Sequence, residues 1–378
     1  MIYVQDPGAM ATANALDILT GWRVADLCAA PGGKSGQAAA KIGDGGFLLS
    51  NEFVPKRAKT IVSNFERLGV KNAIVTSLDT KELPKLYRHF FDLVIVDAPC
   101  SGEGMFRKSD EAVMEWSEEN VALCAARQTE IMKNAAPLVK VGGYLLYSTC
   151  TYSLEENEMI VDAFLKENPD FSLTEVKPAL VNATADGIVF SGDAEPTLKL
   201  TRRFYPHTSR GEGQFIALMK CVGGQDDAQT ILYKDASASP TKSELSAIER
   251  FFKENLISRP DGKIIRVGEN LVLSSHGMPI PPRSVFSAGV LIGRVEKELL
   301  FPSHQFFSAY GHLFKRQENL TRGDARVQKY LLGEEIDAKS FSEGGWCSVI
   351  YEGAVLGGGK ASLMKIKNHY PKGLRIKK

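Results

Sequence analysis

Short apolar segments alternate with longer amphipathic segments over the first 222 residues. The apolar segments are rich in Val, Leu and Ile, which is typical of strands buried on both faces of a parallel sheet. We predict strands at residues 23–27, 46–51, 73–76, 91–96, 143–148 and 214–220. The intervening segments predict helices at residues 7–19, 35–42, 55–68, 117–139 and 153–166, the last opened by a capping box of Ser153 and Glu156. This order predicts a doubly wound, mostly parallel α/β sheet over residues 1–222.

The pattern changes after residue 222. Polar and small residues predict a linker over 223–242. The next segment, 243–305, opens with a helix-like run at 243–255 and continues with β-like runs, so we predict a connecting α+β segment. Residues 306–378 end in β-rich sequence with Gly-rich turns and predict a further small domain.

Composition narrows the class of protein. The chain has 378 residues, of which 44% are hydrophobic and 24% are charged, so it is globular and long enough for more than one domain. The net charge of +1 predicts no particular partner, and nucleic-acid binding would have to come from local patches. No apolar run is long enough for a membrane span, and Asp6 and Asp17 interrupt the N-terminal apolar residues, which argues against a signal peptide.

The six cysteines are too few for a disulfide scaffold, and none forms a Cys-x-x-Cys pair. We therefore expect no metal site and no membrane partner, and we expect a reducing cytoplasmic location in which the cysteines are free thiols.

Acidic residues or cysteines follow five of the predicted strands. Asp26 precedes a Gly-rich loop, Glu52 follows the second strand and Asp79 the third. The fourth strand ends in Asp97-Ala-Pro-Cys100, and the fifth in Thr149-Cys150. Ligands of open parallel sheets bind beyond the carboxyl ends of the strands, so we expect these residues to form one site.

The Gly-rich loop indicates the class of ligand. Cys28-Ala-Ala-Pro-Gly-Gly-Lys34 has Cys where a phosphate loop needs its first Gly, and it does not match Gly-x-Gly-x-x-Gly. Glu52 follows the loop at about the sequence separation at which dinucleotide-binding folds place the carboxylate that accepts hydrogen bonds from a ribose. Gly32 and Gly33 would allow close approach of the backbone. A nucleoside ligand without a pyrophosphate fits best, and S-adenosylmethionine is the candidate.

Two cysteines, Cys100 and Cys150, are expected at the ends of neighbouring strands. One hypothesis is thiol redox chemistry, which the lack of Cys-x-x-Cys disfavours. The other is covalent activation of a pyrimidine, in which a thiolate adds to cytosine carbon 6 and carbon 5 then accepts a methyl group. Asp97 would bond the cytosine amino group and ring nitrogen and stabilise the adduct. The remaining cysteines are expected to fill the core: Cys28, Cys124, Cys221 and Cys347.

Several long motifs resemble those of the Nol/Nop/Sun family of RNA cytosine-5 methyltransferases over about residues 3–220. They are Tyr3-Val-Gln-Asp-Pro7, Asp26–Lys34, Asn51-Glu52, Asp97-Ala-Pro-Cys-Ser-Gly-Glu-Gly104, Tyr147-Ser-Thr-Cys-Thr151 and Glu155-Glu-Asn157. The resemblance implies a class I, Rossmann-like methyltransferase fold, with Cys150 as the nucleophile and Cys100 assisting product release. It also implies that the methyl donor is bound by Cys28, Ala29, Ala30, Pro31, Gly32, Gly33, Lys34, Glu52, Asp79 and Asp97.

The C-terminal sequences Leu356-Gly-Gly-Gly-Lys360 and Lys367–Arg375 resemble bacterial ribosomal RNA methyltransferases of this family, whose tail has a PUA-like domain. The resemblance implies a PUA-like RNA-binding domain over 306–378. Residues 360–378 hold seven Lys or Arg and no acid, which favours phosphate contacts. The candidate RNA-binding residues are Arg107, Lys108, Lys367, Lys372 and Arg375, with a further basic run at Lys199, Arg202, Arg203 and Arg210.

The sequence thus predicts methylation of cytosine carbon 5 in RNA, and the C-terminal resemblance favours small-subunit ribosomal RNA. Transfer RNA is an alternative substrate for the same chemistry. A catalytically silent RNA-binding assembly factor is an alternative of another class, because family members usually carry an RNA-binding lobe before the Gln-Asp-Pro segment and here the chain starts two residues before Tyr3. We expect this difference to affect RNA affinity more than donor binding.

Overall fold

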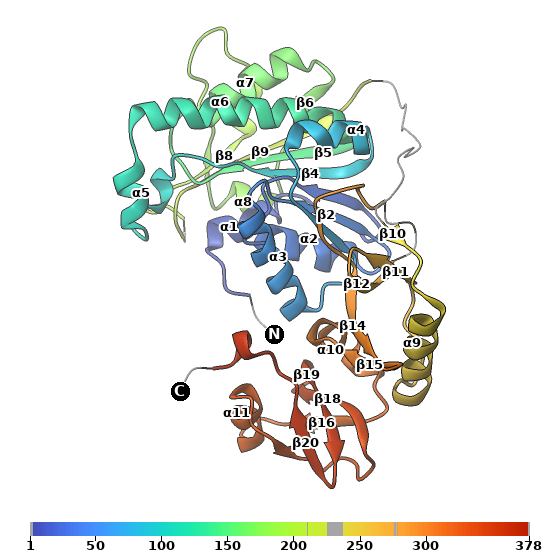
Figure 1. Cartoon of the computed structure of the whole chain (residues 1–378). Coiled ribbons are helices and arrows are strands. Elements are labelled where there is room, and N and C mark those ends of the chain that lie inside the picture. Colours follow the sequence, from blue (N-terminus) through green and yellow to red (C-terminus); the bar gives the residue numbers. More distant parts are fainter. Residues whose placement is uncertain (1–2, 210, 225–236, 276, 278, 377–378) are drawn as a thin grey trace. The chain divides into compact units, whose positions relative to one another are not determined.

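The computed structural model describes residues 3–209, 211–224, 237–275, 277 and 279–376 (Figure 1). The described residues up to 224, apart from 62–72, form one unit, and residues 62–72 with those from 237 onward form a second. The predicted linker falls largely outside the described residues, and the predicted domain limits stay predictions. Within the described residues, no helix is both long and apolar enough to cross a membrane.

The first unit is built on a sheet with the strand order β3-β2-β1-β4-β5-β9-β8-β7, and β6 pairs with β9. The strands from β3 to β5 are parallel, while β9 runs antiparallel to β5. Their bounds are β1 Arg23–Asp26, β2 Phe47–Asn51, β3 Ala73–Thr76, β4 Phe91–Asp97, β5 Val139–Thr149, β6 Phe171–Leu173, β7 Ala185–Asp186, β8 Arg202–Phe204 and β9 Gln214–Cys221. The central strands are apolar because helices cover both faces, and Leu48 and Leu93 are fully buried.

Helices α4, α6 and α7 cover one face of this sheet, and α1, α2 and α3 cover the other (Figure 1). The helices are α1 Pro7–Thr12, α2 Gly33–Ile42, α3 Pro55–Leu68, α4 Leu83–Tyr87, α5 Asp110–Glu115, α6 Glu118–Ala135, α7 Glu158–Glu167 and α8 Pro178–Val181. Short 3₁₀ turns are η1 Thr80–Glu82, η2 Glu103–Met105, η3 Ala136–Leu138 and η4 Pro196–Leu200. Two layers of helices around a mostly parallel sheet give the predicted doubly wound architecture.

Three predicted helices differ most from the structure. The helix predicted to reach residue 19 ends at Thr12, where the Asn14 side chain donates to the Met10 carbonyl and competes with further helical bonds. The helix predicted to reach residue 139 ends at Ala135, because Pro137 has no N–H with which to continue it. The capping box predicted at Ser153 is wrong: α7 begins at Glu158, and the Ser153 hydroxyl donates to Glu155 instead.

The second unit contains two five-stranded sheets, with the orders β10-β11-β12-β14-β15 and β16-β18-β19-β20-β17. The strands are β10 Ser237–Ala238, β11 Lys263–Val267, β12 Asn270–Ser274, β13 Val285–Ala288, β14 Val290–Glu296, β15 Leu299–Pro302, β16 Gln317–Leu320, β17 Ile336–Asp337, β18 Gly345–Tyr351, β19 Ala354–Ser362 and β20 Lys365–Asn368. The helices are α9 Lys242–Asn255, α10 His304–Tyr310, α11 Ala325–Leu331 and the 3₁₀ turns η5 Gly311–Leu313 and η6 Lys372–Leu374. One apolar core joins Phe251 of α9, Phe307 of α10 and Trp346 of β18.

Candidate active site

The predicted strand ends meet at the carboxyl edge of the sheet in the first unit. Asp26 ends β1 and Asp97 ends β4, and these two strands are parallel neighbours. Glu52 follows β2, Asp79 follows β3 and Cys150 follows β5. The strand order reverses between β1 and β4, and ligands of doubly wound folds bind at such a crevice.

The Gly-rich loop joins β1 to α2 and carries the predicted residues Cys28, Ala29, Ala30, Pro31, Gly32 and Gly33. Gly32 has φ 103°, a left-handed conformation that a side chain would strain. A Cβ atom on Gly33 would lie 1.9 Å from Nε2 of Gln5, so glycine is needed for Gln5 to lie against the loop. Burial raises the pKa of the Cys28 thiol, which therefore stays protonated. The residue is only partly buried, unlike Cys124, Cys221 and Cys347, so it is not a core residue as they are.

Lys34 and Asp97 form an ion pair at the centre of this edge. Nζ of Lys34 lies 2.7 Å from Oδ2 of Asp97, and the Ser148 hydroxyl donates to Oδ1 at 2.7 Å. Burial lowers the pKa of Lys34, but the adjacent Asp97 carboxylate outweighs it and the net pKa is raised. The Lys34 side chain is therefore charged, while the Asp97 side chain remains 31% exposed and accessible to a ligand.

Asp26 is a buried carboxyl group beneath the Gly-rich loop. Burial raises its pKa to about 7, although the Ser35 hydroxyl donates to Oδ2 at 2.6 Å and opposes the shift. Oδ1 is buried and has no hydrogen-bond partner among the described residues. An orphaned carboxylate oxygen at this edge favours a ligand that carries a donor or a positive charge.

Glu52 and Asp79 lie beside the loop with part of their hydrogen-bonding capacity already used. The Glu52 carboxylate accepts the Val54 N–H at 3.0 Å and lies 3.6 Å from Nη1 of Arg57. Asp79 caps η1 and pairs with Lys81 at 2.8 Å. Each carboxylate has further lone pairs with which to accept hydroxyl donors.

The sulfur atoms of Cys100 and Cys150 lie 3.2 Å apart, and the Cys150 N–H donates to the Cys100 sulfur at 3.3 Å. The hydrogen bond from the Cys100 thiol lowers the pKa of Cys150; burial opposes the shift and Lys34 supports it. The same hydrogen bond raises the pKa of Cys100 well above its usual value. Asp97 also opposes the lowering at Cys150, and the net direction of the two pKa shifts favours a thiolate at Cys150 over one at Cys100.

All six cysteines lie in the described part of the chain, and Cys150 differs from the other five in the direction of its pKa shift. The pKa is raised in each of the other five, chiefly by burial except at Cys100, where the hydrogen bond to Cys150 is the largest cause. Since the thiolate is the reactive form of cysteine, Cys150 is the cysteine whose surroundings favour nucleophilic attack.

Two buried side chains that sequence reasoning missed hold the cysteine loops. The Glu156 carboxylate accepts the Ser101 N–H, the Ser101 hydroxyl and Nε2 of Gln128. The Asn157 amide accepts the Thr149 hydroxyl and donates to the Thr151 carbonyl, so it contacts both neighbours of Cys150. The motif Glu155-Glu-Asn157 was the available signal, but the capping-box hypothesis assigned Glu156 to a helix end instead.

The predicted basic residues lie in different surroundings. Arg107 lies 3.4 Å from Glu212, while Lys108 pairs with Asp6 at 2.8 Å and with Glu212 at 3.6 Å. In the second unit, Lys367 lies in β20, Lys372 in η6, and Arg375 donates to the Tyr370 carbonyl.

The further basic run is not a surface patch. Arg202 and Arg203 are buried and pair with Asp186 and Glu158, because β8 lies inside the sheet. Arg210 lies outside the described residues. Lys199 is exposed, so among the described members of the run it alone presents its charge at the surface.

Comparison with known proteins agrees with this geometry. Residues 13–220 match the model of the family described as 16S rRNA methyltransferase RsmB/F. The chain belongs to this family. Residues 317–376 match the Methyltransferase RsmF PUA domain. The predicted family, the class I methyltransferase fold with a PUA-like region, and S-adenosylmethionine as methyl donor are thereby confirmed.

Individual relatives cover different shares of the chain. The Ribosomal RNA small subunit methyltransferase F of Psychromonas ingrahamii is 30% identical and matches 99% of this chain and 79% of its own length. The 28S rRNA (cytosine-C(5))-methyltransferase of Mus musculus is 37% identical over 59% of this chain, which spans 28% of the mouse protein. Among solved structures, PH0851 is 31% identical with a TM-score of 0.52, over 57% of this chain and 46% of that one.

Proposed function

We propose that this RsmB/F-family protein transfers a methyl group from S-adenosylmethionine to carbon 5 of cytosine in ribosomal RNA. Small-subunit RNA is the favoured substrate, free or within a ribosomal particle, and the cytoplasm is the favoured location. The observation that carries the proposal is the pair of sulfurs 3.2 Å apart, with the Cys150 pKa lowered, beside Asp97 at the ligand-binding edge of the sheet. The nucleobase and the class of RNA follow from what these two relatives act on, cytosine carbon 5 and ribosomal RNA.

The residues at the edge suit the proposed donor. S-adenosylmethionine supplies a methyl group on a positively charged sulfonium and carries a ribose diol. The buried Asp26 oxygen without a partner and the carboxylates of Glu52 and Asp79 are acceptors of the kind that such a ligand needs. We assign Glu52 to the ribose hydroxyls and the loop from Cys28 to Lys34 to the remainder of the donor.

In the proposed reaction, the Cys150 thiolate forms a bond to carbon 6, and the electron pair of the ring makes carbon 5 nucleophilic. Carbon 5 takes the methyl group, and the bond between that methyl group and the donor sulfur breaks and leaves its electron pair on the sulfur. A base then removes the carbon-5 proton, the sulfur–carbon bond breaks, and its electron pair returns to Cys150 as a thiolate. Asp97 bonds the base and stabilises the adduct, and Cys100, in contact with the reacting sulfur, assists the release step.

The test uses labelled donor with transcripts of small-subunit ribosomal RNA and of transfer RNA, followed by mapping of 5-methylcytosine. Methyl transfer to transfer RNA alone would favour the alternative substrate, and transfer to neither would favour the silent assembly factor.

Denaturing gels with labelled RNA then test the covalent step. Cys150→Ala should abolish both product and adduct, whereas Cys100→Ala should accumulate an adduct that resists denaturant. Cys221→Ala is the control, since its thiol lies outside the site. An adduct with Cys150→Ala and none with Cys100→Ala would reverse the roles.

A further inference from the structure

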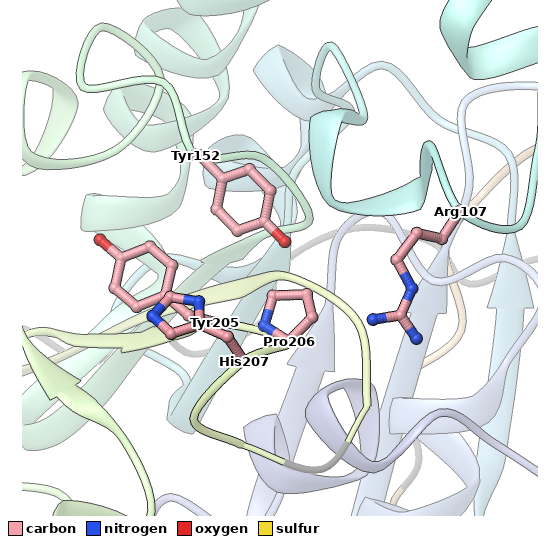
Figure 2. Close-up of a pocket in the computed structure, with 5 residues that line it drawn as sticks. All are labelled: Arg107, Tyr152, Tyr205, Pro206 and His207. Atoms are coloured by element: carbon pink, nitrogen blue, oxygen red, sulfur yellow. The ribbon is translucent and has the colours of Figure 1, made fainter.

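A pocket of about 500 Å³ lies in the first unit, lined by Arg107, Tyr152, Tyr205, Pro206 and His207 (Figure 2). Its volume is within the range of about 300–1,000 Å³ that small-molecule sites occupy. Tyr152 comes from the loop after β5, two residues beyond Cys150. The lining residues from Tyr205 to His207 follow β8, and Arg107 follows η2.

Three of the lining rings form a stacked row. The ring centroids of Tyr152 and Tyr205 are 5.8 Å apart with an interplanar angle of 20°, and those of Tyr205 and His207 are 5.5 Å apart at 28°. Tyr152 and Tyr205 are half-buried and His207 is exposed, so the row borders the pocket at the surface and not the core. Near-parallel aromatic faces at a surface are the platform on which single-stranded nucleic acids stack their bases.

The pocket is held close to the reacting sulfur by backbone contacts. The Gly104 N–H donates to the Cys150 carbonyl at 2.9 Å, and the Gly213 N–H donates to the Gly104 carbonyl at 3.4 Å. A Cβ atom on Gly213 would lie 2.4 Å from the Tyr152 ring, so the ring lies directly over this glycine. Tyr152 is two residues beyond Cys150, and two residues of extended chain span at most about 7 Å. That length corresponds to one or two nucleotides of RNA at about 3.4 Å per stacked base.

Arg107 adds a positive charge at the rim of the pocket, and Figure 2 shows its guanidinium beyond the Tyr152 hydroxyl. Its side chain is 64% exposed, and its contact with Glu212 is through Nε at 3.4 Å. A guanidinium so exposed can bind a phosphate in its forked geometry.

We propose that this pocket binds a nucleobase of the RNA next to the target cytosine, stacked on the aromatic row, with Arg107 on the adjoining phosphate. The inference rests on the proposed function and names a subsite for the same substrate. A cytosine that reaches Cys150 must leave its own stack, and its neighbour then loses a stacking partner. The aromatic row supplies a replacement that tolerates any base, because every base has a flat face.

The experiment compares Tyr205→Leu with Tyr144→Leu in the full chain. Tyr144 forms a similar stacked pair with Trp22, at a centroid distance of 6.0 Å and 22°, but it lies in the middle of β5 and does not line the pocket. With a small-subunit ribosomal RNA transcript, Tyr205→Leu should raise the KM for RNA about 5- to 100-fold, the equivalent of one lost base stack. Tyr144→Leu should leave that KM within about twofold of the wild-type value, and Tyr205→Phe should recover most of the loss, because it keeps the ring.

Calorimetric titration with the donor checks that each variant is folded. For Arg107→Gln, the slope of log RNA affinity against log salt concentration should become less steep by about 0.7–0.9, because one phosphate contact is lost. If the wild type transfers no methyl group, the proposed function fails, and the filter-binding Kd for the same transcript still tests the pocket. The pocket assignment is overturned if folded Tyr205→Leu binds and methylates the transcript as tightly and as fast as the wild type.

Discussion

Ser101 donates both its backbone N–H and its hydroxyl to the carboxylate of Glu156. The N–H lies 3.0 Å from Oε2, and the Ser101 hydroxyl also lies 2.9 Å from the hydroxyl of Thr151. Ser101 follows Cys100 and Thr151 follows Cys150. One buried network therefore joins the residue after each cysteine, and we expect it to help fix the separation of the two sulfurs.

We predict that Glu156→Gln lowers kcat for methyl transfer and lowers stability by about 1–3 kcal/mol. The amide would turn an N–H donor toward groups that are themselves donors, Ser101 and Gln128. Steady-state kinetics and thermal melting measure the two effects, and the Kd of the donor should stay within about twofold. The control is Glu155→Gln, an exposed neighbour. A Glu156→Gln enzyme with wild-type kcat would show that this network does not position the cysteines.

A second prediction concerns the pH dependence of Cys150. Its pKa is lowered by the Cys100 thiol and by Lys34, so the thiolate persists to lower pH than in a free cysteine. Cys100→Ala and Lys34→Met should each raise that pKa, and the alkylation rate of the Cys150 peptide should then begin to rise at higher pH. Iodoacetamide labelling followed by mass spectrometry measures the profile. Profiles that coincide with the wild type in both variants would remove these residues as the cause.

For donor binding, Glu52→Ala should weaken the affinity for S-adenosylmethionine by about 1.5–3 kcal/mol, the range for hydrogen bonds to a charged group. The carboxylate is buried beside the Gly-rich loop and keeps lone pairs beyond those used by Val54 and Arg57. Calorimetric titration measures the Kd, with Glu167→Ala on the exposed side of α7 as the control. An unaltered Kd for Glu52→Ala would contradict the assignment of Glu52 to the ribose hydroxyls.

In the second unit, replacing Lys367 and Lys372 together by Ala should weaken RNA binding and flatten its salt dependence. Each lost phosphate contact should reduce the slope of log affinity against log salt by about 0.7–0.9. Arg375 is left in place because it donates to the Tyr370 carbonyl and its loss would disturb the fold. Lys85→Ala with Lys133→Ala, two exposed lysines of the first unit, is the charge-matched control. Equal slopes for the two double variants would exclude Lys367 and Lys372 from RNA binding.

Sequence patterns predicted the elements whose causes are local. The short apolar run at Ala73–Thr76 and the amphipathic run at Pro55–Leu68 correspond to β3 and α3 with the predicted limits, because a fully buried strand is apolar throughout and a surface helix repeats its buried face at a fixed period. The meeting of acids and cysteines at one edge followed from the parallel topology. The roles of Glu156 and Lys108 were not predictable in this way, since their partners Ser101 and Asp6 are 55 and 102 residues distant in sequence. No periodic pattern in the sequence predicts a contact between residues so far apart.

The contacts of Asp6 in the first unit join segments that are synthesised at very different times. Its carboxylate accepts Nζ of Lys108 and the N–H of Glu212, which is 206 residues further along the chain. At about 5–20 residues per second, a ribosome needs about 10–40 s to deliver that last partner. Until then Gln5, which lies against Gly33 in the finished protein, has only the Lys108 contact of Asp6 to hold its segment there. The segment around Gln5 and Asp6 is therefore among the last parts of this unit to settle, and it closes over the Gly-rich loop only after β9 has been made.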